Sequence, residues 1–169
     1  MKVTSIEAIA AALSGAEVRY LVAGGIAVNA HGYLRMTNDL DIVIHLESDN
    51  LRRGWSVLEV LGYHPTIPVT LEEFADRATR ERWIREKGMQ VLQLWSDQHR
   101  ETPIDLFVTE PFDFETEYSH AYWGELSPGL AIPFVRLETL IRMKDDVGRP
   151  GDLEDVQHLR WILEEREDE

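Results

Sequence analysis

The chain has 169 residues, of which 44% are hydrophobic, a size that suits one domain with a sizeable core. It contains no cysteine, so disulfides, thiolate metal ligands and thiol nucleophiles are excluded. The formal net charge of -14 argues against general coating of nucleic acids, and no apolar run approaches the roughly 18 residues of a membrane span.

Helix and strand signals alternate along the sequence. Thr4 with Glu7, and Thr70 with Glu73, have the spacing of helix-capping boxes. Interleaved strands and helices predict a single α/β or α+β domain, with a core over 1–135 and C-terminal helices over 136–169 packed on it. In chain order we expect a helix over 4–17, a strand over 18–25, a helix over 26–32, a strand over 35–46, helices over 50–63 and 74–88, strands over 89–95 and 102–110, an irregular stretch over 111–130, a strand over 131–135, and helices over 137–148 and 154–169.

The strand predicted over 35–46 carries two acids on one face. Because residues two apart on a strand share a face, Asp39 and Asp41 point the same way. A rise of roughly 3.3 Å per residue separates them by about 6.6 Å, so they can converge on one cation or bracket two. Taken alone, an Asp-Leu-Asp sequence at the start of a strand more often forms a turn or lies on a solvent-exposed edge of a sheet.

A third acid strengthens the metal interpretation. Asp105 lies in an apolar strand between Ile104 and Leu106, where an uncompensated carboxylate is costly. Three clustered carboxylates also repel one another, and a divalent cation relieves both costs.

The pair Gly24-Gly25 lies where a strand meets a helix. Glycines there let backbone N–H groups approach an anion while the helix N-terminus supplies partial positive charge. A tight turn is the ordinary meaning of such a pair.

Together these motifs resemble the signature of the polymerase-beta-type nucleotidyltransferase superfamily. The glycine pair precedes Asp39-Leu40-Asp41 by thirteen residues, and a strand acid follows at Asp105. The spellings "RMTNDLD" and "LIRMKDDVGRPGDLEDVQHL" are similar to the AbiEii-type branch, which includes toxin components of toxin–antitoxin systems. The resemblance spans roughly residues 21 to 159.

The resemblance implies a mixed central sheet flanked by helices, with a short C-terminal helical part. It implies that Asp39, Asp41 and Asp105 bind Mg²⁺, as one or two ions, and that Asp105 can take the proton from the attacking hydroxyl. It also implies triphosphate binding by Gly24 and Gly25.

Several further residues of the predicted site each have a structural and a functional interpretation. The resemblance matches Lys144 to a phosphate-binding lysine, although a lone lysine in a helix is more often a surface residue. It places Asp152 in the site, whereas the residues alone favour an N-cap of the last helix with Asp155 favouring the helix dipole. Arg35 and Thr37 share the acids' face, so Arg35 can hold phosphate oxygens or form an exposed ion pair.

Residues 77–87 form the one basic cluster of the chain. The cluster contains Arg80, Arg82 and Arg85. Because acidic residues are interleaved with them, the usual interpretation is a solvent-exposed helix face. Our hypothesis is that this segment guides a polyanionic acceptor such as transfer RNA.

These observations predict a cytoplasmic, Mg²⁺-dependent nucleotidyltransferase that moves a nucleoside monophosphate from an NTP such as ATP to a hydroxyl, releasing pyrophosphate. Expected acceptors are RNA or a protein in a toxin–antitoxin setting, with an antitoxin as a partner. One alternative is an antibiotic nucleotidyltransferase acting on a lincosamide or aminoglycoside. Another is a non-catalytic nucleotide-binding partner protein. No membrane or disulfide-linked partner is expected.

Overall fold

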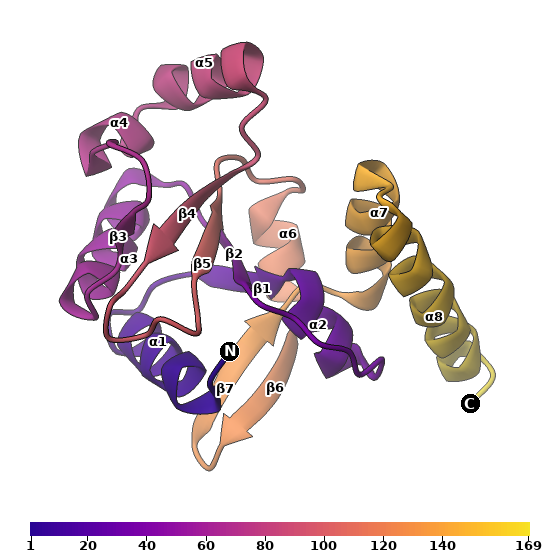
Figure 1. The fold of residues 1–169 in the computed structure, drawn as a ribbon. Coiled ribbons are helices and arrows are strands. Elements are labelled where there is room, and N and C mark those ends of the chain that lie inside the picture. Colours follow the sequence, from indigo (N-terminus) through magenta and orange to yellow (C-terminus); the bar gives the residue numbers. More distant parts are fainter.

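The computed structural model describes residues 1–169 and is built around a seven-stranded mixed sheet (Figure 1). The strand order is β3-β4-β5-β2-β1-β7-β6. The elements are α1 (Val3–Gly15), β1 (Tyr20–Ala23), α2 (Gly24–His31), β2 (Leu40–Ile44), α3 (Ser48–Val60), β3 (His64–Pro65), α4 (Leu71–Ala75), α5 (Arg77–Lys87), β4 (Val91–Trp95), β5 (Ile104–Phe107), α6 (Phe114–Ser119), β6 (Tyr122–Ser127), β7 (Leu130–Phe134), α7 (Leu137–Val147) and α8 (Pro150–Glu167). The predicted mixed sheet flanked by helices is confirmed.

The centre of the sheet brings distant segments together. Strand β2 is antiparallel to β1, pairing Asp41 with Ala23, and parallel to β5, pairing Asp41 with Asp105. Strand β1 also pairs with β7 in parallel. The end of β1, the start of β2 and the start of β5 therefore lie at one place in the sheet.

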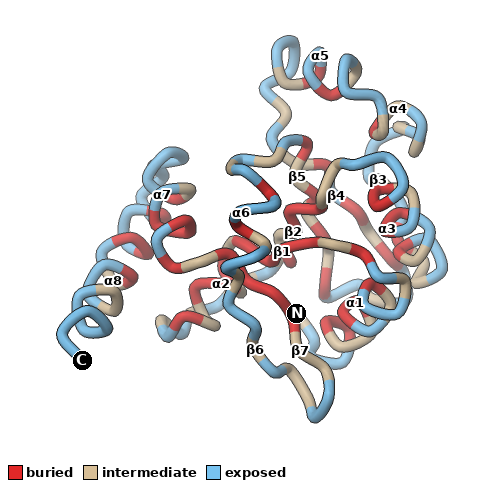
Figure 2. Tube along the Cα trace, turned by 180° about the vertical axis from the view of Figure 1, so that it is seen from behind, coloured by how far each residue is buried: buried red, intermediate tan, exposed pale blue.

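The core follows these central strands. Leu21, Val43 and Ile104 are fully buried, and Figure 2 shows buried residues along the sheet and on the inner faces of the helices. Helices α7 and α8 pack against each other and contact α2 rather than lying over the sheet centre (Figure 1). None of the helices combines the length and the apolar character that crossing a bilayer requires.

The strand predicted from residue 35 begins later, at Leu40. Strand β1 ends at Ala23, so residues 35–39 have no neighbouring strand to pair with. Instead, the side chain of Asn29 bonds the backbone of Arg35, accepting from its N–H at 2.9 Å and donating to its C=O at 3.0 Å. The alternation of side chains between two faces continues in this segment although it is not part of the sheet: Leu34 and Met36 are exposed, and Arg35 between them is half-buried.

Two other predictions about helices were wrong. The helix expected over 74–88 is two helices, because Asp76 is extended and its carboxylate accepts the N–H of Thr79 at 3.1 Å as the cap of α5. Thr4 does not cap α1, which begins at Val3 without a side-chain cap. The capping box of Thr70 and Glu73 is confirmed.

The stretch over 111–130, expected to be irregular, contains α6 and β6. Asp113 caps α6 by accepting the N–H of Thr116 at 2.8 Å. Pro128 and Gly129 form the turn to β7, and Gly129 has a φ of +80° that favours glycine. The turn is the local feature that permits the β6–β7 hairpin.

Candidate active site

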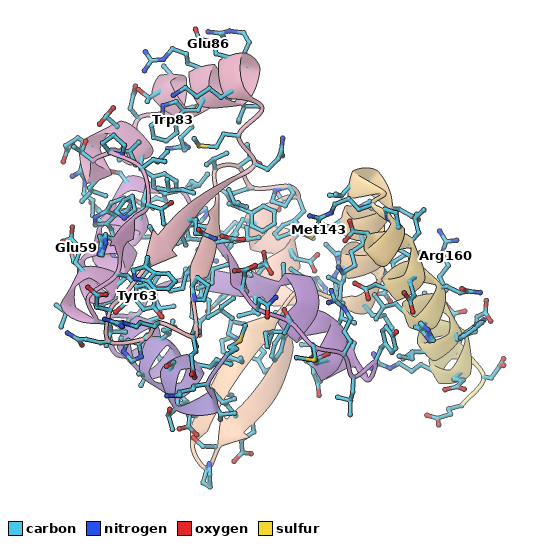
Figure 3. The ribbon with its side chains drawn as sticks, in the orientation of Figure 1. Glu59, Tyr63, Trp83, Glu86, Met143 and Arg160 are labelled. Carbon is cyan, nitrogen blue, oxygen red and sulfur yellow. The ribbon has the colours of Figure 1, made fainter.

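A cavity of about 520 Å³ lies over the start of β2 and β5 and is closed on one side by α7 and α8. The nine residues proposed from the sequence as site residues all line it. They are Gly24, Gly25, Arg35, Thr37, Asp39, Asp41, Asp105, Lys144 and Asp152. Figure 3 shows Met143, another lining residue, on the side of α7 that faces the sheet.

Three carboxylates share the floor of this cavity. Asp41 and Asp105 are partners in the parallel register of β2 and β5, so their side chains leave the same face of the sheet. Asp39 lies two residues before Asp41 and lines the same cavity. Near Asp105, the one neutral hydrogen-bond donor is Gln93, whose Nε2 lies 3.4 Å from Oδ1 of Asp105.

Burial and neighbouring carboxylates raise the pKa values of Asp41 and Asp105. Burial, followed by the charges of Asp105 and Asp39, raises the pKa of Asp41 to about 7, against the opposing effects of Lys144 and Arg149. Burial and the charge of Asp39 also raise the pKa of Asp105. The cavity floor therefore holds more negative charge than its protein cations neutralise.

This floor suits a hard divalent cation in its chemistry. All the donors are carboxylate oxygens, the ligands that Mg²⁺ prefers, and added positive charge would relieve their repulsion. No three His, Asp or Glu side chains lie as close together as the ligands of one ion. Because like charges stand apart when they are not neutralised, binding would require the three carboxylates to draw together.

The glycine pair begins α2 directly beside the acids. Gly24 has a φ of +63°, and a Cβ at this position would overlap the carboxylate of Asp41. A Cβ at Gly25 would overlap the side chain of Thr37. Gly24 and Gly25 line the cavity at the first turn of α2, packed closely against Asp41 and Thr37, and the N–H groups of a first helical turn suit phosphate oxygens.

A paired set of charges from α7, α8 and the segment before β2 forms a further wall of the cavity. The Nζ atom of Lys144 lies 2.7 Å from Oδ2 of Asp155 and 3.3 Å from Oδ1 of Asp152, and all three residues are buried. Arg149 binds Asp152 through its Nε at 2.7 Å, and Arg35 binds Asp155 at 2.8 and 2.9 Å. Both carboxylates therefore orient cations on the cavity wall.

No protein-family model matches the sequence, and no curated protein sequence matches it either. Solved structures match over nearly the whole chain. The crystal structure of ANT(2″)-Ia in complex with adenylyl-2″-tobramycin has a TM-score of 0.58 at 15% identity, covering 95% of this chain and 88% of that one. A putative nucleotidyltransferase from Thermotoga maritima has a TM-score of 0.56 at 15% identity, covering 96% and 92%. The solution structure of the antibiotic-resistance factor ANT(2″)-Ia has a TM-score of 0.54 at 17% identity, covering 98% and 92%.

The chain has a nucleotidyltransferase fold. At this level of identity the likeness establishes the architecture, and activity has to be argued from the residues of the site.

In this nucleotidyltransferase fold, Asp152 is not the N-cap of the last helix. Helix α8 begins at Pro150 with Arg149 as its N-cap, and Asp152 lies within the first turn. Its Oδ2 accepts the backbone N–H of Arg149 at 3.3 Å while Oδ1 faces Lys144. Asp152 therefore stabilises the start of the helix and lines the cavity at the same time.

Sequence reasoning missed several residues of the cavity wall. Arg142 and Arg149 add two cations to Lys144 and Arg35. Gln90 before β4, Phe107 at the end of β5 and Thr109 after it extend the wall. The signal for Arg149 was its position next to Pro150, since a proline at the first helical position brings the preceding side chain to the helix start.

The basic segment differs from its predicted solvated face. Arg80 is buried, and its Nη1 donates to the carbonyl oxygen of Phe74 at 2.6 Å. Arg82 and Arg85 are exposed. In Figure 3, Trp83 lies on the side of α5 toward the sheet while Glu86 points away. The exposed positive surface is therefore smaller than the sequence suggested, because Arg80 does not contribute to it.

Proposed function

We propose that the protein is a Mg²⁺-dependent nucleotidyltransferase that transfers a nucleoside monophosphate from an NTP to a hydroxyl acceptor. The observation that supports this most directly is the single cavity that joins a carboxylate cluster to a glycine-lined helix N-terminus and a cationic wall. A site for a simple anion would not need three carboxylates, and a plain cation site would not need the wall.

Different residues of the cavity would bind the triphosphate and the metal ion. The N–H groups at Gly24 and Gly25 and the cations Lys144 and Arg149 bind the triphosphate oxygens. Asp39, Asp41 and Asp105 would hold Mg²⁺, which when bound would neutralise phosphate charge and favour in-line displacement.

The proton of the acceptor also needs a destination. Asp105, with its raised pKa, accepts the proton as the acceptor oxygen attacks the α-phosphorus. The new bond joins that oxygen to phosphorus, and the bond to the bridging oxygen breaks and releases pyrophosphate. Atoms and charge balance without a further reactant.

Incubation with labelled NTPs, Mg²⁺, bulk RNA and a cell lysate tests the proposal. We expect label transfer to an acceptor in the wild type, and a loss of about a thousandfold or more in Asp105→Asn. The matched control is Asp97→Asn, which removes an exposed acid outside the cavity and should leave transfer unchanged. Nucleotide binding that is independent of Mg²⁺, with no transfer under any condition, would instead favour the non-catalytic binding protein.

The acceptor separates two versions of this function. The motifs similar to the AbiEii branch favour RNA or protein as the acceptor in a toxin–antitoxin setting, with an antitoxin as partner. The likeness to ANT(2″)-Ia, together with a net charge of -14 that suits a cationic antibiotic, favours aminoglycoside modification. Overexpression in bacteria distinguishes them: growth arrest supports the first, and tobramycin resistance supports the second.

A further inference from the structure

A second cavity, of about 560 Å³, adjoins the candidate active site. It lies between α5 and the segments that follow β2 and β5. Thr109 lines both cavities, so the second adjoins the first just past the end of β5. Its volume is within the range of sites for small molecules.

A buried cation without an ionic partner faces this second cavity. Arg80 is 7% exposed and lines the cavity, yet no carboxylate lies within ion-pair distance of its guanidinium. Its one hydrogen bond to the protein is the contact of Nη1 with the carbonyl oxygen of Phe74. Burial lowers the pKa of Arg80 although the more distant charges of Asp76 and Glu110 act to raise it, so these acids do not offset the cost of burying the charged form. A buried guanidinium with unused donors is suited to a carboxylate or phosphate.

The carboxylates of the same cavity already have partners. Glu81 pairs with Arg77 at 2.9 Å, and Glu110 accepts the N–H of Leu46 at 3.3 Å. Glu47 accepts two backbone N–H groups at the start of α3. The buried guanidinium is therefore the charged group of the cavity that most lacks a counter-charge.

The sheet order places this cavity on the acceptor side of the reaction. Gly24 and Gly25 follow β1, and Asp105 lies on β5, with β2 between the two strands. An in-line displacement needs the attacking hydroxyl opposite the leaving pyrophosphate. With the triphosphate at the glycines, the acceptor approaches from the β5 side, where Thr109 leads into the second cavity.

We propose that this second cavity binds an oxyanion of the acceptor, a phosphate or a carboxylate, through Arg80 while the acceptor hydroxyl reaches Asp105. This inference rests on the proposed function for the role of the acceptor, but the oxyanion site itself does not. Four residue steps lead from Asp105 to Thr109, the last two beyond the end of β5, so at 3.3 Å per residue the two Cα atoms lie at most roughly 13 Å apart. The acceptor would therefore carry its hydroxyl and its oxyanion on the order of 10 Å apart.

Titration of ¹⁵N-labelled protein with inorganic phosphate, and separately with acetate, tests the site by NMR. We expect chemical-shift changes at the amides of Leu46, Glu81 and Glu110, with the tighter of the two anions identifying the oxyanion. Arg80→Met should weaken this binding by about tenfold or more, and Arg80→Lys, which keeps the charge but loses the planar fork, by a few-fold. Arg77→Met is the matched control, because it removes an exposed guanidinium from the same cavity, and should change the binding by less than about twofold.

Two results would overturn the proposal. One is anion-induced shifts confined to the amides of Gly24 and Gly25, and the other is binding to Arg80→Lys that equals the wild type. Nucleotide titration reports on the first cavity separately, so a protein that binds phosphate at Arg80 but no nucleotide would contradict the proposed function and leave the oxyanion site standing. In transfer assays, the dinucleotide UpU should be labelled more efficiently with a 5′-phosphate than without one, and Arg80→Met should remove the difference.

Discussion

Asp155 places its carboxylate 2.7 Å from the ammonium group of Lys144, with both side chains buried between α7 and α8. The same carboxylate binds Arg35, which comes from the segment before β2. One acid thus fixes two cations of the cavity wall that belong to distant parts of the sequence. Asp155 itself does not line the main cavity, so its effect on nucleotide binding has to act through these cations.

Replacing Asp155 with asparagine should weaken nucleotide binding and stability together. Removing one partner of a buried ion pair leaves uncompensated charge, so we expect a loss of about 3 kcal/mol in the free energy of unfolding. The KM for the NTP should rise by about tenfold with a smaller change in kcat, because the cations lose their orientation. Glu154→Gln, an exposed neighbour on α8, should change neither quantity. A fall in kcat without a change in KM would contradict a positioning role.

A methyl group at Gly24 should disrupt the site directly. Gly24→Ala combines a positive φ with overlap between the new Cβ and Asp41, so about 1–3 kcal/mol of stability should be lost. Nucleotide binding, measured by calorimetry, should weaken by about tenfold or more because the phosphate cradle is displaced. Gly151→Ala is the control, since nothing lies within 4 Å of a Cβ there and its φ is not positive. Equal affinities in the two variants would argue against phosphate binding at the glycine pair.

Asp41→Asn should stabilise the metal-free protein while removing its response to Mg²⁺. The pKa of Asp41 is raised to about 7 in the folded chain, so its charged form is disfavoured by folding. That penalty is absent below the unfolded pKa near 4 and grows as the pH rises through about 7. We therefore expect the variant to gain on the order of 1–3 kcal/mol at pH 8 in EDTA, and almost nothing at pH 4.

Thermal unfolding with and without Mg²⁺ measures this prediction. Added Mg²⁺ should raise the Tm of the wild type and leave that of Asp41→Asn unchanged. Asp97→Asn should retain the wild-type response, because its carboxylate is exposed and lies outside the cavity. An Asp41→Asn variant whose Tm still rises with Mg²⁺ would show that the ion binds elsewhere.

The local part of the site could be predicted because it depends on spacing along the chain. Alternation placed Arg35, Asp39 and Asp41 on one face, and the glycine pair marked the change from strand to helix. Both features persist in the structure, although residues 35–39 are held by the side chain of Asn29 rather than by a strand. Successive side chains still point to opposite sides because this alternation is a property of extended backbone, whether or not it pairs with a neighbouring strand.

The remaining part depends on contacts that sequence spacing does not encode. The register that pairs Asp41 with Asp105 is set by the packing of β2 against β5, across more than sixty residues of chain. The burial of Arg80 follows from how α5 packs beside α4, where its guanidinium donates to the carbonyl oxygen of Phe74, whereas its charge alone predicted an exposed residue. In both cases tertiary packing overrides the preference of the isolated segment.

A buried carboxylate far from the cavity should make the fold sensitive to acid. Glu117 is 1% exposed and joins α6 to the start of α7, accepting the N–H of Arg136 at 2.7 Å and the hydroxyl of Thr139 at 2.8 Å. Burial acts to raise the pKa of Glu117, but hydrogen bonds from the backbone and side chain of Arg136 and from Thr139 outweigh it and lower that pKa. A carboxylate with a lowered pKa stabilises the folded state above its unfolded pKa, near 4.5, and this contribution is lost as the pH falls through the folded value.

The free energy of unfolding should therefore decline as the pH falls below about 4.5 in the wild type. Glu117→Gln should lose about 3 kcal/mol at pH 7, because Arg136 is left without its carboxylate, and should show a flatter decline in acid. Glu125→Gln, an exposed acid on β6, should keep both the stability and the pH profile of the wild type. Urea denaturation between pH 3 and 7 measures all three proteins, and parallel profiles for Glu117→Gln and the wild type would show that other groups control the acid response.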